Sequence, residues 1–133
     1  MSGTVIKNPK RAASTGAYSD GILVDGWLFV SGQGPIDVAT GQVIPGSIEE
    51  EVRVTLRNLG EVLAAAGCSY KDVVRCTCHL ARIEDFDRFN ETYQEFFSQP
   101  LPTRTTVQSV LGLGIKVEID AIARVPSQAK ESR

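Results

Sequence analysis

The chain has 133 residues, of which 42% are hydrophobic and 23% charged, as in an ordinary globular domain. Fourteen lysines and arginines oppose 16 acidic residues, so the net charge is −2 and no nucleic-acid surface is expected. No apolar run approaches the roughly 18 residues of a membrane span, and residues 1–16 lack the apolar stretch of a signal peptide. Three cysteines cannot form a disulfide framework. We expect one cytoplasmic domain over residues 1–133, frayed from about residue 127, with reduced thiols.

The first elements in the chain are predicted to form a β-hairpin. Residues 21–24 and 27–31 are apolar runs of strand character, separated by Asp25-Gly26. That dipeptide favours a type I′ turn, because both central residues of such a turn need a positive φ. A glycine-containing loop follows to Gly46, with a turn expected at Thr40-Gly41.

The first helix has clear start and stop signals. Ser47 and Glu50 have the spacing of a capping box, and Gly67 is placed to end the helix. Apolar residues then recur in steps of three and four, which predicts one buried stripe: Ile48, Val52, Leu56, Leu59, Leu63 and Ala66. The charged residues between them are expected to form the solvated face: Glu49, Glu51, Arg53, Arg57 and Glu61.

The second half alternates between strand and helix signals. Residues 73–81 alternate with period two, with Val74, Cys76, Cys78 and Leu80 on one face and Arg75, Thr77 and His79 on the other. An aromatic stripe predicts a core-facing helix over 85–98, ended by the following prolines. Strands are predicted at 104–110 and 115–125, joined by a tight hairpin turn at 111–114. The last strand's inward residues are Ile115, Val117, Ile119, Ala121 and Ala123.

This order of elements predicts an α+β fold, a mixed sheet with two helices packed on one face. The opposite face of the sheet then needs a cover, and a partner subunit is the natural candidate. Three common site motifs do not fit this arrangement. Cys76 and Cys78 share a strand face from which His79 points away, so the three cannot bind one metal ion. The segment from Gly32 to Gly34 opens no helix, which excludes a dinucleotide loop, and no Ser-His-Asp set can be assembled.

Arg104 stands at the start of its strand, where it is either a surface charge, able to pair with Glu118 across the hairpin, or a binding residue. The runs 102–107 and 115–123 resemble the C-terminal signature of the RidA/YjgF family of reactive-intermediate deaminases. The likeness extends over most of the chain. It includes Tyr18, residues 29–33, Thr40-Gly41, the Ala-Ala-Gly end of the first helix, residues 89–93, and Phe96-Phe97.

The resemblance implies a chorismate-mutase-like homotrimer with ligand clefts between neighbouring chains. In that family the arginine holds a substrate carboxylate, which corresponds to Arg104, and a glutamate in the last strand positions a water, which corresponds to Glu118. A planar guanidinium suits a carboxylate because it donates two parallel hydrogen bonds. The positions that line the cleft are matched here by Tyr18, Ser31, Gly32, Asn90 and Thr106.

The implied reaction is hydrolysis of 2-imino acids, such as those formed from 2-aminoacrylate, to 2-keto acids and ammonia. Such an imine is already electrophilic, so no metal or other cofactor is required. The chain departs from the family pattern at Thr106, where many members have a cysteine, at Gly34, and in the 111–114 loop. Alternatives are a deaminase of another enamine such as 2-aminomuconate, a non-enzymatic keto-acid regulator or chaperone-like module, and RNA cleavage, which the charge balance disfavours.

Overall fold

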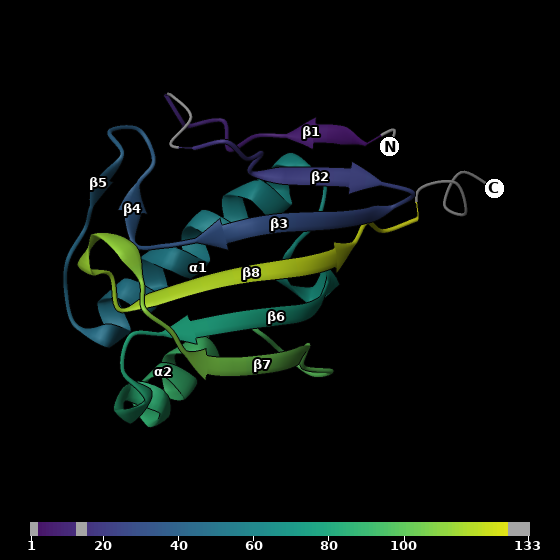
Figure 1. Cartoon of the computed structure of the whole chain (residues 1–133). Helices are drawn as coiled ribbons and strands as arrows, with labels where there is room; N and C mark the ends of the chain where they lie inside the picture. Colours follow the sequence, from purple (N-terminus) through teal and green to yellow (C-terminus); the bar gives the residue numbers. More distant parts are fainter. Residues whose placement is uncertain (1–2, 13–15, 128–133) are drawn as a thin grey trace.

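The computed structural model describes residues 3–12 and 16–127, so residues 128–133 of the expected frayed tail lie outside the described part. A sheet of order β1-β2-β3-β8-β6-β7 carries helices α1 and α2 on one face, which confirms the α+β prediction (Figure 1). The elements are β1 (Thr4–Ile6), β2 (Gly21–Val24), β3 (Trp27–Gln33), β4 (Ile36–Asp37), β5 (Gln42–Val43), α1 (Ile48–Ala65), β6 (Val73–Leu80), α2 (Phe86–Tyr93), β7 (Thr103–Gln108) and β8 (Val117–Arg124).

The local signals in the first half of the chain are confirmed. Asp25 (φ 52°) and Gly26 (φ 81°) form the tight turn between β2 and β3. At the start of α1 the Glu50 amide donates to Ser47 Oγ at 3.1 Å, and the Ser47 amide donates to the Glu50 carboxylate at 2.8 Å. Gly67 follows the helix with φ 79°, a conformation that glycine adopts without strain.

Glu51 does not lie on the solvated face of α1, which corrects the prediction. Its side chain is 1% exposed, and its carboxylate accepts the Lys116 amide at 2.8 Å and Lys116 Nζ at 3.1 Å. A buried carboxylate needs such charged and backbone partners to offset its lost hydration. Glu51 therefore ties α1 to the segment that leads into β8.

The hairpin predicted at 111–114 is wrong. β7 pairs with β6 in parallel, and β8 lies between β3 and β6. Parallel neighbours need a long crossover, which α2 provides between β6 and β7. The polar face of β7 suits the edge of the sheet, whereas the small apolar residues of β8 suit its centre. Alternation in a sequence identifies a strand without identifying its neighbours.

Three further differences have local causes. The short strands β1, β4 and β5 were not predicted, because segments this short show no clear period. Val74 was predicted on the inward face of its strand, but it is 40% exposed. A bulge between Val73 and Arg75 shifts the alternation, so that Val73 is buried instead. α2 ends at Tyr93 rather than near residue 98, and the irregular chain beyond it lets consecutive Phe96 and Phe97 both contact the Tyr70 ring.

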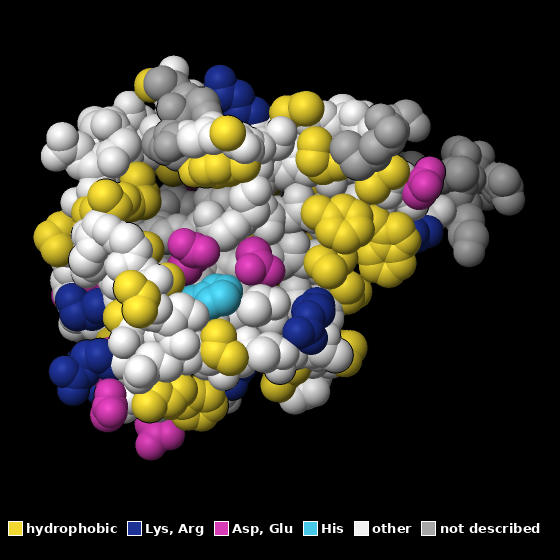
Figure 2. All heavy atoms as spheres, viewed as in Figure 1, with side chains coloured by type: hydrophobic (Ala, Val, Ile, Leu, Met, Phe, Trp, Pro, Cys, Tyr) yellow, Lys and Arg dark blue, Asp and Glu magenta, His cyan; other side chains and the backbone are white. Residues whose placement is uncertain are grey.

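The two faces of the sheet differ in character. Four of the predicted inward residues lie in β8 and belong to the core with Leu28, Leu56 and Phe89, namely Val117, Ile119, Ala121 and Ala123. Ile115 precedes the strand and is buried outside this core. The face without helices carries an apolar patch of Trp27, Phe29 and Ile122 beside polar and acidic side chains (Figure 2). Within 3–12 and 16–127, the helices are too short or too polar to cross a membrane.

Candidate active site

Arg104 lies on the helix side of the sheet. In the parallel ladder it stands beside Cys76, whose side chain is buried in the core. Its guanidinium carbon lies over aromatic rings of α2, 4.8 Å from the centroid of Tyr93 and 5.3 Å from that of Phe89. Contacts of this kind favour a cation and hold the planar group in one orientation. The aromatic stripe, predicted as core, is core and also supports this arginine.

Two other predicted residues accompany Arg104. Asn90 lines the same surface hollow, together with Tyr93 and Pro102. Thr106 follows on the same face of β7, and its Oγ1 is buried without a hydrogen-bond partner among the described residues. The buried Tyr93 hydroxyl likewise finds no oxygen or nitrogen partner there. The Cys76 thiol lies within reach of this hydroxyl but is a weak partner. Buried hydroxyls without a strong partner beside a cation indicate a ligand position, and Tyr93 is a candidate site residue that the sequence patterns did not reveal.

Glu118 lies on the opposite face of the sheet, beside β3. A Cβ on Gly32 would stand 2.5 Å from Glu118 Oε2, so only glycine at position 32 allows this approach. Tyr18, Gly32 and Glu118 line one pocket of about 150 Å³, hereafter the Glu118 pocket. The structure thus brings together three of the predicted residues, from three separate segments of the chain.

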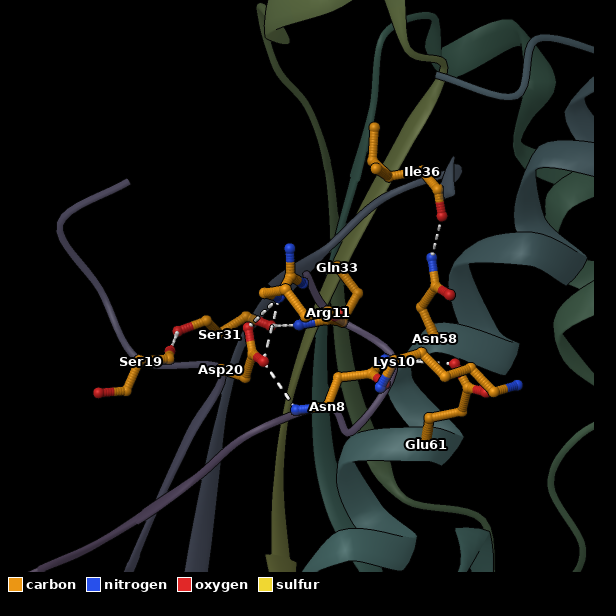
Figure 3. A network of polar contacts seen from close by, with 10 residues as sticks. All are labelled: Asn8, Lys10, Arg11, Ser19, Asp20, Ser31, Gln33, Ile36, Asn58 and Glu61. Carbon is orange, nitrogen blue, oxygen red and sulfur yellow. Dashed lines mark hydrogen bonds and ion pairs between the residues drawn. The ribbon is translucent and has the colours of Figure 1, made fainter. Parts of the chain in front are cut away.

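A polar network holds the Tyr18 segment against β3 (Figure 3). The buried Asp20 carboxylate accepts the Asn8 amide at 2.8 Å and pairs with Arg11 Nε at 2.9 Å. Ser31 donates its amide to the Asp20 carbonyl at 2.9 Å and its Oγ to the Ser19 carbonyl at 2.6 Å. The predicted site residue Ser31 therefore does not line the Glu118 pocket, and its contacts instead hold the segment that follows Tyr18.

The predicted residues form two half-sites that do not meet within one chain. Paired residues on neighbouring strands share a face, so Arg104 lies with the buried Cys76, and Glu118 lies with its register partner His79 on the other face. The alternative in which Arg104 pairs with Glu118 across a hairpin is therefore wrong. A small ligand contacting both residues needs Arg104 from one chain and Glu118 from another.

The thiols and the histidine are arranged as the alternation predicted, on opposite faces of β6. Burial raises the pKa of Cys76 to about 11 and also raises that of Cys78, so neither is a nucleophile at neutral pH. His79 Nδ1 lies 2.8 Å from Ser109 Oγ, but its Nε2 is 3.9 Å from Asp120 Oδ2. That distance is too long for the orienting hydrogen bond of a Ser-His-Asp triad.

Comparisons with known proteins identify the family of this chain. A family model described as endoribonuclease L-PSP matches residues 8–125. The chain belongs to this family, also called RidA/YjgF. Proteins named 2-iminobutanoate/2-iminopropanoate deaminase from Rattus norvegicus and Homo sapiens are 46% and 40% identical over 120 residues, 90% of this chain and 88% of theirs.

Solved structures of relatives have the same fold. A putative endoribonuclease from Thermotoga maritima is 37% identical with a TM-score of 0.87, over 93% of this chain and 98% of its own. The E. coli protein TdcF, crystallised with bound serine, is 31% identical with a TM-score of 0.84, over 92% of this chain and 99% of its own. The resemblance stated from sequence is confirmed.

Proposed function

We propose that this protein hydrolyses 2-imino acids such as 2-iminopropanoate and 2-iminobutanoate to 2-keto acids and ammonia. The observation that carries the proposal is the pair of half-sites, one presenting an arginine and the other a carboxylate. Relatives with deaminase names at 40–46% identity support it, as does the relative that binds serine, an α-amino acid. Arg104 and Glu118 are proposed as the catalytic pair, with Tyr18, Ser31, Gly32, Asn90 and Thr106 as binding residues.

The proposed assembly is a homotrimer in which neighbouring chains complete each site. The apolar patch of Trp27, Phe29 and Ile122 supports the proposal, because an exposed apolar surface of this kind favours contact with another subunit. We also propose that the protein is cytoplasmic and clears damaged metabolites. Its three cysteines are free and buried, and reduced thiols are typical of cytoplasmic proteins. The net charge of −2 disfavours RNA as a partner.

Each group has a defined part in the proposed reaction. Arg104 donates hydrogen bonds to the substrate carboxylate and fixes the imine carbon relative to Glu118 of the neighbouring chain. Glu118 accepts a proton from water as the water oxygen bonds to that carbon. Glu118 returns this proton to the nitrogen, which completes a neutral carbinolamine. The hydroxyl proton of the carbinolamine then moves to the nitrogen through Glu118, the C=O bond forms as the C–N bond breaks, and ammonia and the 2-keto acid leave. The reaction consumes one water and needs no oxidant or reductant.

The test is to generate 2-aminoacrylate with a serine dehydratase and follow the loss of the imine with and without the protein. Wild type should accelerate the loss above the spontaneous rate. Glu118→Gln, which keeps the shape but cannot take a proton, should lower this rate by about 10²–10⁴-fold and still bind 2-keto acids. Asp120→Asn, two residues along the same face of β8, is the matched control. Keto-acid binding without any catalysed hydrolysis in the wild type would instead identify a regulator.

A further inference from the structure

The Glu118 pocket continues beyond the predicted catalytic and binding residues into an apolar recess. This recess is lined by Gly34, Ile36, Val38, Leu113 and Ile115. Val38 and Ile115 are buried at 7% exposure, and Leu113 stands at the rim at 76%. A methyl or ethyl side chain on an imine would not need so extended an apolar lining. The recess is therefore a candidate position for a larger part of the substrate.

Gly34 keeps the recess open. A Cβ at this position would lie 3.3 Å from Ile115 Cδ1 and 3.7 Å from Ile36 Cγ1, so a branched side chain would fill the space between these residues. The backbone of Gly34 lies outside the left-handed region, so its conformation does not demand glycine. Glycine is needed here only because the missing side chain leaves space between Ile36 and Ile115.

Asn58 holds the recess wall in place. From α1, its side-chain amide donates to the Gly34 carbonyl at 3.0 Å and to the Ile36 carbonyl at 2.8 Å. Figure 3 shows the contact with Ile36. Asn58 is buried at 7% exposure, and helix α1 is anchored in the core. The wall is thus formed before a ligand arrives, as in most small-molecule sites.

The charges around the recess favour an uncharged side chain. Arg11 also lines the Glu118 pocket, but its Nε is 2.9 Å from the buried Asp20 carboxylate. Glu118 adds a second negative charge. A distal carboxylate on the substrate would therefore meet two acidic groups and one already paired cation, whereas an apolar chain would gain contacts with Ile36 and Ile115.

We propose that this recess binds the substrate side chain and that the preferred substrates are 2-imino acids with apolar side chains longer than ethyl. The inference rests on the proposed function, because it assumes that the reacting carbon lies beside Glu118. It makes Gly34 a specificity-determining residue. Each methylene buried in the recess raises kcat/KM by up to about fourfold.

The test compares imines made in place by amino-acid oxidases from alanine, norvaline, norleucine and glutamate. Semicarbazide captures the free imine, so faster hydrolysis by the protein lowers the yield of semicarbazone, which is measured. Binding of the matching 2-keto acids is measured by calorimetry. Wild-type kcat/KM should rise from the alanine to the norleucine imine, with the glutamate imine below alanine. Gly34→Val should remove this rise, because its branched side chain fills the recess that the longer substrate side chains would occupy. Gly112→Val is the control, because a Cβ there has open space and the residue does not line the pocket.

The outcomes separate the two proposals. If the wild type hydrolyses none of these imines, the proposed function fails, and tighter binding of 2-oxohexanoate than of pyruvate would still support the recess. Equal rates and equal keto-acid affinities across the chain lengths would overturn the recess inference alone. A preference for the glutamate imine would also overturn it and point to Arg11. Gly34→Ala, with a smaller side chain, gives the same comparison if the valine variant does not fold.

Discussion

Gly32 and Glu118 show how one missing side chain shapes the site. The carboxylate lies where a Cβ on residue 32 would stand, at 2.5 Å from Oε2. Any larger residue must therefore push Glu118 away from its place in the pocket. The contact is with the far end of a flexible side chain, so the displacement costs little stability but moves the proposed base.

Gly32→Ala is accordingly expected to fold and to lose activity. A shift of about 1 Å in a reacting group can cost about 10²-fold in rate, and we expect a loss of 10- to 100-fold in kcat/KM. The measurement is imine hydrolysis, with the melting temperature as the control for folding. Full activity in a folded variant would mean that Glu118 does not act from its observed position.

The site residues were predicted through family motifs, and their faces through alternation. Cys76 and Glu118 lie on the faces of the sheet that the alternation of their strands predicted. Tyr93 was missed as a site residue, because a buried aromatic on a helix stripe has the same sequence pattern whether or not its hydroxyl has a partner. Glu51 was misplaced because its partner Lys116 is distant in sequence, so periodicity gave no sign of a buried acid.

At the scale of elements, Glu51 links α1 to the start of β8. Its carboxylate accepts from the Lys116 amide, from Lys116 Nζ and from the Gly46 amide at 3.3 Å. The amide bonds hold the chain just before Glu118. Lys116 itself is 42% exposed, so water screens part of the ion pair but not the buried backbone contact.

Glu51→Ala should destabilise the fold by about 2–3 kcal/mol, the effect of leaving a buried amide without its charged acceptor and opening a small cavity. Urea denaturation gives the measurement. Glu91→Ala, an exposed acidic residue of α2, is the control and should change stability by less than about 0.5 kcal/mol. Equal changes in the free energy of unfolding for the two substitutions would show that the contacts of Glu51 do not stabilise the fold.

Element types and the pairing of β2 with β3 were predictable where the chemistry is local, whereas the pairing of β7 was not. The Asp25-Gly26 turn and the Ser47 cap depend on neighbours within four residues, and both are observed. The partner of β7 depends on a crossover through α2, and nothing within β7 itself specifies it. The predicted hairpin failed for this reason, although both of its strands exist.

At the scale of the whole molecule, the order of strands explains why the proposed site would need two chains. β8 lies in the centre of the sheet and β7 at its edge, so Glu118 and Arg104 project from opposite faces. No side-chain rotation brings them together in one subunit. In a ring of three identical subunits, each contact between neighbours would instead unite one half-site of each kind.

This arrangement predicts complementation between two inactive variants. Arg104→Lys loses the bidentate geometry and should lose about 10- to 100-fold in kcat/KM. Glu118→Gln lacks the base. When the chains are unfolded, mixed equally and refolded, about three quarters of random trimers contain both variants, and each of these has one intact site of three. Activity should therefore return to about a quarter of wild type. Light scattering should report about three chain masses, and a mixture no more active than its parents would contradict a site shared between chains.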